Sequence, residues 1–401
     1  MPALTRTLRD LAVEAIRRWG TPLYLTDLDA AAANFHAYRD AFPGSLIAYA
    51  VKANPDPELL SRLAAEGAGA EVVTAVELAL ARRATIPAER IVMNGVGKRD
   101  EELHLALGAG ALINAESLEE LATLLALAAD HPDARIGLRL NPALDAKTHP
   151  HLATGAASSK FGIPIANLPE ALAALRVAGR EPASIGAHIG SAVESVDAFA
   201  ELASRLADVT AALPPTTRID LGGGLATAEP AALAAATRRH LPDPSRLILE
   251  PGRSLVADAG WLLTRVVRVQ PRPAEGLTYL VADAGMTELI RPMLYGAVHP
   301  LALVETGAPL PADHGRVDLA GPICEAGDVL AHDVAQWLSA DELAQGGTGA
   351  ILAIGQAGAY GAAMASVYNG RLRPAEAVLE GGELRLSRRR ETLDDLVARD
   401  A

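Results

Sequence analysis

Short apolar runs alternate with longer segments of helical periodicity along the first two thirds of the chain. Segment 116–132 (ESLEELATLLALAADHP) shows the helical kind, with acidic residues near its start and a proline at its end. The apolar runs that we interpret as strands are 46–51, 70–73, 91–94, 111–114, 135–140, 184–189, 218–221 and 246–250. Eight strand–helix units within about 200 residues favour a closed (β/α)8 barrel, since open doubly wound sheets usually have five or six strands.

The pattern changes after about residue 258. Strand-like runs follow one another with few helical segments between them, at 261–270, 278–285, 299–305, 316–323 and 349–360. We therefore expect an α/β plus β protein. A TIM barrel should span residues 21–258, and a C-terminal β domain should span residues 259–401 together with residues 1–20.

Composition and charge exclude several classes of protein. With 401 residues, 50% of them hydrophobic, the chain can bury the cores of two domains. Its net charge of −13 and its lack of a basic cluster interleaved with aromatic residues argue against nucleic-acid binding. Its single cysteine, Cys324, excludes an internal disulfide framework and fits a reducing compartment. Neither a signal peptide nor a membrane-spanning apolar stretch is recognisable, so we expect a cytoplasmic protein that does not bind membranes.

Lys52 is one of only four lysines in the chain, and it follows the apolar run 46–51 (LIAYAV) directly. A lone lysine at the end of a strand is more often a surface residue. Burial can, however, lower the pKa of an amine and suit it to Schiff-base chemistry with a carbonyl compound or pyridoxal phosphate. Residues further along the chain decide between these two interpretations.

Polar residues follow nearly every predicted strand of the barrel, at the end where the active sites of such barrels lie. They are Lys52, Glu71 to Thr74, Asn94, Asn114, Glu116, Arg139, Asn141, His188, Gly222 to Gly224 and Glu250 to Arg253. Three glycines after the seventh strand form a plain turn as often as a site. At this place in a barrel whose first strand ends in a lysine, they favour a phosphorylated cofactor held by backbone N–H groups.

Ordered motifs over about residues 20–380 carry a specific resemblance: AYAVKAN, HIGS, DLGGG, EPGRSLVADAG, GPICEAGDVL and GAYGAAMASVYNGRLRPAE. They resemble the motifs of the diaminopimelate decarboxylases, pyridoxal-phosphate enzymes with the alanine-racemase-like fold. Decarboxylases of ornithine, arginine and carboxynorspermidine belong to the same fold group, so the fold does not determine the substrate.

The resemblance implies a role for each residue near the cofactor, pyridoxal 5'-phosphate. Lys52 would carry it as a Schiff base, His188 would stack on its pyridine ring, and Glu250 would face the ring nitrogen. A carboxylate there stabilises the protonated pyridinium that takes up electrons when CO2 leaves. Without the motifs, Glu250 would be read as a helix N-terminal acid and His188 as a core or surface residue. The implied phosphate ligands are Ser191, Gly223, Gly224, Gly252 and Tyr360.

The resemblance also assigns the substrate contacts and a proton donor. Arg253, Arg291 and Tyr295 would bind the distal carboxylate of the substrate, and Glu325 its distal amine. A substrate that lacked the second carboxylate would leave the arginines unpaired. Cys324, which taken alone would be read as a small buried residue, would donate the proton to the α-carbon from the other subunit of a homodimer.

The sequence departs from the family pattern at two places, and these departures are compatible with a pocket of altered shape. Ala192 stands after HIGS where the family usually has glutamine, and Ala75-Val76 replaces a common Gly-Gly.

The sequence therefore predicts a homodimeric, metal-free decarboxylase with shared active sites, which converts meso-2,6-diaminopimelate to L-lysine and CO2 in lysine biosynthesis. Alternatives are a decarboxylase of another basic amino acid or of carboxynorspermidine, a racemase, and a catalytically inactive regulatory homologue. The retention of Lys52, Glu250, Cys324 and Glu325 argues against the inactive homologue.

Overall fold

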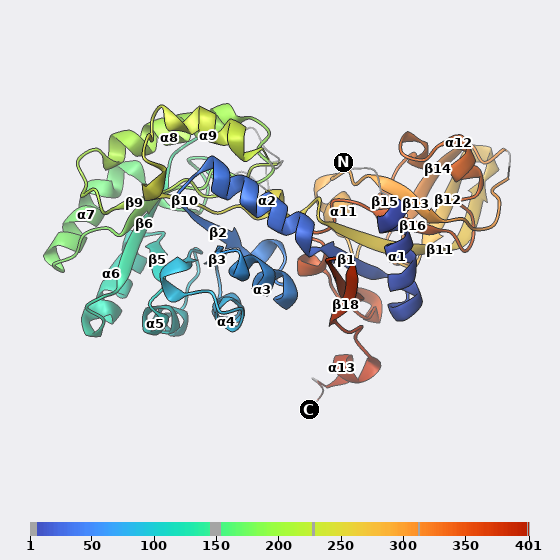
Figure 1. Ribbon diagram of the computed structural model, residues 1–401, viewed down its shortest axis with the longest axis horizontal. Coiled ribbons are helices and arrows are strands. Elements are labelled where there is room, and N and C mark those ends of the chain that lie inside the picture. Colours follow the sequence, from blue (N-terminus) through green and yellow to red (C-terminus); the bar gives the residue numbers. More distant parts are fainter. Residues whose placement is uncertain (1–5, 145–153, 227–228, 312, 399, 401) are drawn as a thin grey trace. The chain divides into compact units, whose positions relative to one another are not determined.

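The computed structural model of the chain describes residues 6–144, 154–226, 229–311, 313–398 and 400 (Figure 1). Contacts divide the chain into two compact units. The barrel unit spans Ala32–Leu255, and the β unit combines Met1–Ala31 with Val256–Ala401. The barrel is therefore an insertion into the chain of the β unit.

Parallel strands of the barrel unit form a closed ring, because β5 pairs with β6 and β10 pairs with β2. The ring strands are β2 (Leu46–Ala50), β3 (Gly69–Val72), β4 (Ile91–Met93), β5 (Leu112–Ala115), β6 (Arg135–Asn141), β8 (Ser184–Gly186), β9 (Arg218–Asp220) and β10 (Leu247–Leu249). A short strand, β7 (Ile163–Pro164), pairs with the end of β6. All eight barrel strands predicted from the apolar runs are confirmed.

Helices follow the strands and lie outside the ring (Figure 1). They are α2 (Leu28–Ala41), α3 (Pro57–Ala65), α4 (Ala75–Arg83), α5 (Asp100–Ala109), α6 (Leu118–Leu127), α7 (Leu168–Val177), α8 (Val196–Thr210), α9 (Pro230–Arg238) and α10 (Arg253–Val256). Several begin at a side chain that caps free N–H groups: Asp56 before α3, Thr74 before α4, Ser117 before α6 and Ser195 before α8. At these four helices, the cap residue marks the end of the loop that connects the preceding strand to the helix.

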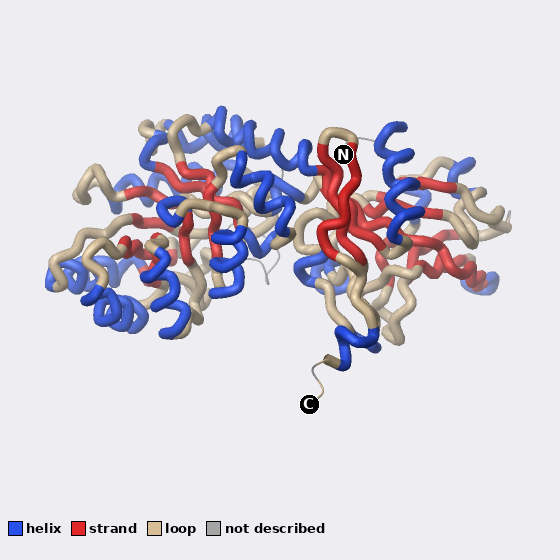
Figure 2. Tube along the Cα trace, turned by 60° about the horizontal axis from the view of Figure 1, so that its bottom comes forward, coloured by secondary structure: helices blue, strands red, loops and turns tan. Residues whose placement is uncertain are grey.

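The β unit is built on one sheet in which β1 (Leu23–Asp27) lies between β11 and β17. Figure 2 draws the strands of the chain in red. The other strands are β11 (Gly260–Arg272), β12 (Leu277–Ala282), β13 (Leu301–Glu305), β14 (Arg316–Ala320), β15 (Val329–Ala331), β16 (Ile351–Ile354), β17 (Ala375–Glu380) and β18 (Glu383–Arg388). Its helices are α1 (Arg6–Trp19), α11 (Arg291–Tyr295), α12 (Ala340–Ala344) and α13 (Leu393–Val397). The predicted β character of this region is confirmed.

Strand β1 belongs to the β unit, whereas the sequence expectation placed residues 21–258 in the barrel. The physical reason is its pairing, antiparallel with β11 and parallel with β17. Leu23 and Leu25 of this strand share a core cluster with Ala12, Ala15 and Ile16 of α1. The amphipathic helix at the start of the chain thus packs on the sheet of its own unit.

Candidate active site

The upper interior of the barrel is polar, although such barrels are usually filled with branched apolar side chains. Lower down, a small apolar cluster contains Leu46, Ala48, Val92, Leu112 and Ile248. Nearer the carboxyl ends of the strands, six buried polar side chains lie close together: Glu71, Asn94, Asn114, Ser184, Asp220 and Glu250. Each must find a partner inside the protein, because a buried polar group without one is costly.

Lys52 lies in the short 3-10 turn Val51–Ala53 that follows β2, and its amine reaches the next strand. Its Nζ forms an ion pair of 2.5 Å with Oε2 of Glu71 on β3. The Lys52 side chain is 40% exposed, whereas that of Glu71 is 1% exposed. A buried carboxylate therefore holds a lysine amine whose own position is open to solvent.

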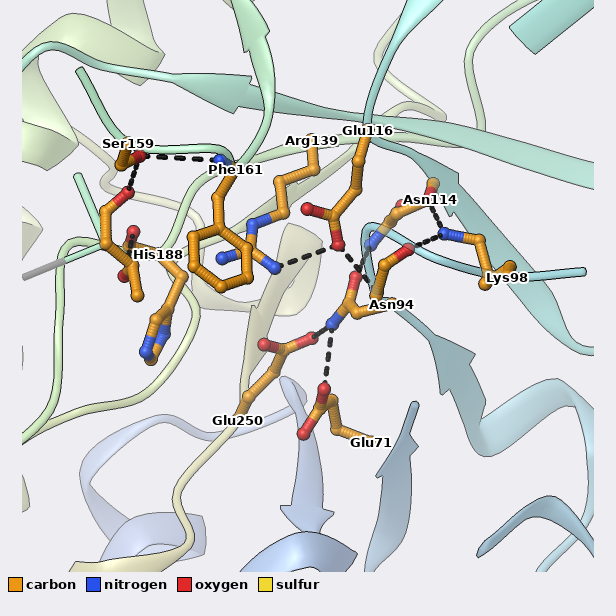
Figure 3. A network of polar contacts seen from close by, with 12 residues as sticks. Glu71, Asn94, Lys98, Asn114, Glu116, Arg139, Ser159, Phe161, His188 and Glu250 are labelled. Atoms are coloured by element: carbon orange, nitrogen blue, oxygen red, sulfur yellow. Dashed lines mark hydrogen bonds and ion pairs between the residues drawn. The ribbon is translucent and has the colours of Figure 1, made fainter. Parts of the chain in front are cut away.

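Two amide side chains connect the acids of this layer (Figure 3). Asn94 Nδ2 donates to Glu250 Oε1 at 2.6 Å and to Glu71 Oε1 at 3.3 Å. Asn114 Nδ2 donates to Asn94 Oδ1 at 2.9 Å, and Ser184 Oγ donates to Asn114 Oδ1 at 2.6 Å. A continuous chain of hydrogen bonds thus runs from β8 across β5 to the acids on either side of β2.

Glu250 follows β10 and is hydrogen-bonded to Asp220 at the end of β9. Burial, followed by the negative charges of Asp220 and Glu71, raises the pKa of Glu250 well above its usual value. Burial also raises the pKa of Asp220, to about 6. Both shifts favour the protonated, uncharged forms of these two carboxyl groups.

His188 is a neutral imidazole whose tautomer is fixed by the backbone. The N–H of Gly223 donates to Nδ1 of His188 at 3.1 Å, so this nitrogen carries no proton. Burial lowers the pKa of His188 well below its usual value, and the positive charges of Arg139 and Lys52 lower it further. The uncharged ring can therefore stack on another flat group at no cost in buried charge.

The glycines after β9 approach neighbouring backbone more closely than any side chain would allow. A Cβ atom at Gly223 would lie 2.0 Å from the carbonyl oxygen of Glu250, and one at Gly224 would lie 1.9 Å from that of Gly190. Gly224 also has a φ of 108°. Glycine is required here, and glycine-rich turns after barrel strands are of the kind that lets a phosphate group approach the backbone.

Arg253 opens α10 directly after Gly252, and its Nη2 donates to Ser191 Oγ at 3.1 Å. The structure therefore brings together two residues that the resemblance gave separate roles, one to the substrate and one to the phosphate. A Cβ atom at Gly252 would lie 3.0 Å from that of Ala50 at the end of β2, so this loop is packed against the turn that carries Lys52. Ala192, the residue that departs from the family pattern, has a φ of 59°.

A second polar network lies around Arg139 at the rim. Arg139 Nη1 donates to Glu116 Oε1 at 3.0 Å, and its guanidinium carbon lies 5.0 Å from the centre of the Phe161 ring. The amine of Lys98, whose side chain is fully buried, forms a 2.9 Å ion pair with Glu120. Glu120 in turn accepts the N–H of Glu116 at 2.7 Å. Both Lys98 and Lys52 have a carboxylate partner, but the side chain of Lys98 is fully buried whereas that of Lys52 is 40% exposed.

The remaining predicted site residues lie in the β unit. Arg291 is buried at the start of α11 and Tyr295 is half-buried at its end. Cys324 and Glu325 are exposed in the loop between β14 and β15. Tyr360, half-buried after β16, has a φ of 57°, an uncommon backbone conformation for a side chain of this size. The grouping of these residues with the barrel site stays a prediction.

Helix α11 and the loop that carries Cys324 and Glu325 are neighbours within the β unit. A Cβ atom at Gly327 of this loop would lie 3.4 Å from the side chain of Met293, which belongs to the helix. Tyr368 donates its hydroxyl proton to Glu325 Oε1 at 2.7 Å. This hydrogen bond and the negative charge of Glu325 raise the pKa of Tyr368.

Sequence reasoning did not single out Asp220, Ser184 or Tyr368. Asp220 lies inside the quoted DLGGG motif, and a charged residue inside an otherwise apolar strand was the available signal. Ser184 and Tyr368 carried no such signal, because their roles depend on partners far away in the sequence. In the described part of the chain, no group of three or more His, Cys, Asp or Glu side chains could hold a metal ion. None of the described helices is long and apolar enough to cross a membrane.

Comparison with known proteins adds independent information. Residues 28–257 match the family model described as the pyridoxal binding domain of pyridoxal-dependent decarboxylases. The chain is 41% identical to the diaminopimelate decarboxylase of Deinococcus radiodurans over 388 residues, which cover 96% of the chain and 97% of that protein. It is 39% identical to the diaminopimelate decarboxylase of Aquifex aeolicus, covering 96% and 92% respectively.

Solved structures agree. The diaminopimelate decarboxylase of Helicobacter pylori in complex with L-lysine superposes with a TM-score of 0.87 at 34% identity, over 96% of this chain and 98% of that one. A lysine/ornithine decarboxylase from Vibrio vulnificus in complex with putrescine has the same fold, with a TM-score of 0.79 at 23% identity.

Proposed function

The chain belongs to the pyridoxal-phosphate-dependent diaminopimelate decarboxylases, and from that premise we propose how its residues convert meso-2,6-diaminopimelate to L-lysine and CO2. One observation carries the proposal. A lysine amine, a buried acid with a raised pKa and a glycine-lined backbone lie at the same rim of a parallel barrel.

The residues at this rim fit pyridoxal phosphate. Lys52 supplies the amine that carries it, Gly223, Gly224 and Gly252 supply the close backbone approach that a phosphate needs, and the neutral His188 supplies a flat ring for stacking. Ser191 and Tyr360 are proposed as further phosphate ligands. When bound, the cofactor supplies an electron sink for the electron pair that remains when CO2 leaves.

Glu71 and Glu250 have different tasks in this proposal. Glu71 holds the amine of Lys52 when that amine is not engaged, through the ion pair on β3. Glu250 holds a proton on a carboxyl oxygen at the place proposed for the pyridine nitrogen, and can pass that proton to the nitrogen. The acid is then left as a carboxylate beside a cation, which is favourable in a buried site.

The β unit supplies the substrate contacts in this proposal. Arg291 and Tyr295 bind the distal carboxylate together with Arg253 of the barrel unit, and Glu325 binds the distal amine. Cys324 donates the proton to the α-carbon after CO2 has left. Since Cys324 and Glu325 are exposed on their own unit, we assign them to the site of the second subunit in a homodimer. The proposed setting is lysine biosynthesis in the cytoplasm.

The test is CO2 release measured side by side with meso-diaminopimelate, lysine, ornithine, arginine and carboxynorspermidine. We expect release from meso-diaminopimelate with L-lysine as the product, and at least tenfold less from the others, because only diaminopimelate presents a second carboxylate to the arginines. Lys52→Ala should abolish release. Arg291→Ala should lower kcat/KM for diaminopimelate by about 10- to 100-fold, the equivalent of one charged hydrogen bond of about 1.5–3 kcal/mol. A wild type that prefers ornithine, with Arg291→Ala unchanged, would contradict the proposal.

A further inference from the structure

We propose that Asn94 is a positioning residue for the reaction: its side-chain amide holds Glu71 and Glu250 in fixed relative positions, and Asn114 sets the direction in which that amide points. The inference rests on the proposed function, since it takes Glu71 as the partner of Lys52 and Glu250 as the partner of the cofactor ring.

The geometry around Asn94 uses both of its N–H groups on acids. Its Nδ2 donates to Glu250 Oε1 at 2.6 Å and to Glu71 Oε1 at 3.3 Å (Figure 3). Exposures of 3% for Asn94, 1% for Glu71 and 7% for Glu250 keep water from replacing these contacts. Hydrogen bonds to charged acceptors are stronger than neutral ones, and a primary amide has only two protons to give. Asn94 therefore links the two acids through one amide group.

The direction of the Asn94 amide matters, because the reversed amide would place its oxygen against both carboxyl groups. Asn114 Nδ2 donates to Asn94 Oδ1 at 2.9 Å, which only the observed orientation permits. Ser184 Oγ donates to Asn114 Oδ1 at 2.6 Å and fixes the second amide in the same way. The hydroxyl group of Ser184 on β8 thus orients Asn114, and Asn114 in turn directs the NH2 group of Asn94 toward the two acids.

The hydrogen-bonded side chains of Asn94, Asn114 and Ser184 fit inside the barrel because residue 137 of β6 is a glycine and has no side chain. Gly137 of β6 lies opposite Asn114 in the sheet. A Cβ atom at Gly137 would lie 1.9 Å from Ser184 Oγ and 2.1 Å from Asn114 Oδ1. Any other residue at this position would therefore break the chain of hydrogen bonds. The side chains of Asn114 and Ser184 occupy the space that a side chain at position 137 would need.

Charged groups on the neighbouring strands make the position of Glu250 sensitive to Asn94. Asp220 is hydrogen-bonded to Glu250 from β9, and Lys52 contacts Glu71 from the turn after β2. Arg139 of β6 and His188 after β8 line the small cavity that also contains Asn94 and Glu250. A carboxylate in place of the Asn94 amide would add a further acid to Glu71, Asp220 and Glu250, with no donor to separate them.

Two substitutions at Asn94 distinguish positioning from packing. Asn94→Asp keeps the shape of the side chain and removes the donors, whereas Asn94→Ala removes the donors and leaves space for water. If the amide positions the acids, we expect cofactor affinity to fall about tenfold in Asn94→Ala and at least tenfold further in Asn94→Asp. If Asn94 only fills space, the order is reversed, because Asp has nearly the volume of Asn. That order would overturn the proposal.

A readout on the apoprotein needs neither cofactor nor substrate. The infrared carbonyl band of protonated carboxyl groups, followed as a function of pH, should persist to higher pH in Asn94→Asp than in wild type. The matched control is Asn34→Asp on α2, which also replaces an amide donor. Asn34 Nδ2 donates to Leu255 O at 2.9 Å. The control should leave the titration and the cofactor affinity unchanged. An unchanged titration in Asn94→Asp would refute the proposal.

The variant Asn114→Asp provides a further test, which remains informative if Asn94→Asp does not fold. It removes the donor to Asn94 Oδ1 and releases the orientation of Asn94, so cofactor affinity should fall by about threefold to tenfold. No fall in Asn114→Asp and in Asn94→Ala would contradict the proposal. If these effects are observed while the wild type releases no CO2 from diaminopimelate, the positioning role stands and the substrate assignment fails.

Discussion

At the scale of single residues, the barrel interior concentrates three carboxyl groups, Glu71, Asp220 and Glu250, where apolar side chains would be expected. Burying acids in this way destabilises the charged forms, and the protein responds in two ways. It supplies amide donors from Asn94 and Asn114, and the raised pKa values of Glu250 and Asp220 favour their uncharged forms. Stability is thus given up for chemistry at this layer, as is common in active sites.

Asp220 makes this cost measurable as a pH dependence. Its pKa is raised from 3.8 to about 6, so between these pH values the folded protein holds a proton that the unfolded chain has released. The free energy of unfolding therefore falls as the pH rises through this window, and is level above it. Asn at this position does not titrate and can still accept the N–H of Gly222. We expect Asp220→Asn apoprotein to gain up to about 3 kcal/mol relative to wild type between pH 4 and pH 7, by urea unfolding.

Asp318 of the β unit gives a control of opposite sign. Burial would raise the pKa of Asp318, but hydrogen bonds from the Asp333 N–H, His332 and Arg316 outweigh it and lower the pKa. Asp318→Asn should therefore be less stable than wild type above the pKa of the unfolded carboxyl group, and this difference should shrink as the pH falls from there through the lowered pKa of the folded protein. If the free energies of unfolding of Asp220→Asn and Asp318→Asn changed with pH in the same direction relative to wild type, the effects would not come from the carboxyl groups that were replaced.

At the scale of elements, arginines stabilise the loops at the amino-terminal end of the barrel through backbone carbonyl groups. Arg135 of β6 donates to Ala88 O, Glu89 O and Gly110 O. Arg180 donates to four carbonyl oxygens of the segment before β6, those of Ala128, His131, Pro132 and Ala134. A guanidinium group offers five donors in a rigid plane, whereas an ammonium offers three on a flexible stem. At these two positions the chain therefore uses arginine for contacts that a lysine could not make in the same number.

Arg180→Lys should therefore destabilise the protein although it conserves charge. Three protons cannot reach four carbonyl groups spread over this segment, so we expect a loss of about 1–2 kcal/mol, the equivalent of one or two hydrogen bonds. Urea unfolding measures it. Arg176→Lys, at an exposed position of α7, is the matched control and should change stability by less than about 0.5 kcal/mol. Equal effects at both positions would refute the role of the guanidinium.

Elements differ in how far the sequence predicts them. The barrel strands were predictable because each is a short apolar run and most are followed closely by a helix, so that the pattern is local. Strand β1 lies inside residues 21–258, the range expected for the barrel, but it pairs with strands of the β unit. Its neighbours β11 and β17 come from distant parts of the chain. Local pattern carries no information on such pairings.

The candidate site shows the same limit. Lys52, His188 and Glu250 were predictable because strand ends and motifs mark them. Asp220 and Ser184 were not, because their importance lies in contacts across the barrel with Glu250 and Asn114. Sequence pattern thus indicates which side chains arrive at the rim, whereas the hydrogen bonds between them depend on the closed ring.

At the scale of the whole molecule, the proposed site residues are divided between two units, and the proposed homodimer unites them. Lys52→Ala and Cys324→Ala homodimers should each be nearly inactive. After subunit exchange, half of the dimers are mixed and one of their two sites carries neither substitution. Activity should therefore return to about one quarter of the wild-type value, measured as CO2 release.

Lys52→Ala mixed with Glu250→Gln is the matched control for this experiment. Both substitutions lie in the barrel unit, so every site of a mixed dimer keeps one of them and no activity should return. Recovery in the control, or none with Cys324→Ala after exchange has been demonstrated by mass, would refute the shared site.

The place of β1 between β11 and β17 has a consequence for the nascent chain. A ribosome releases the chain from its amino terminus, so Leu23–Asp27 emerges first, and the whole of segment 32–255 follows before either neighbour of this strand exists. The barrel can close while the apolar strand waits with its backbone unpaired, a state that attracts chaperones or aggregates. A messenger truncated before the codon of Ala375 would supply β11 but not β17, and would leave one edge of the strand unpaired. Quality control of this protein therefore depends on the last strands to be translated.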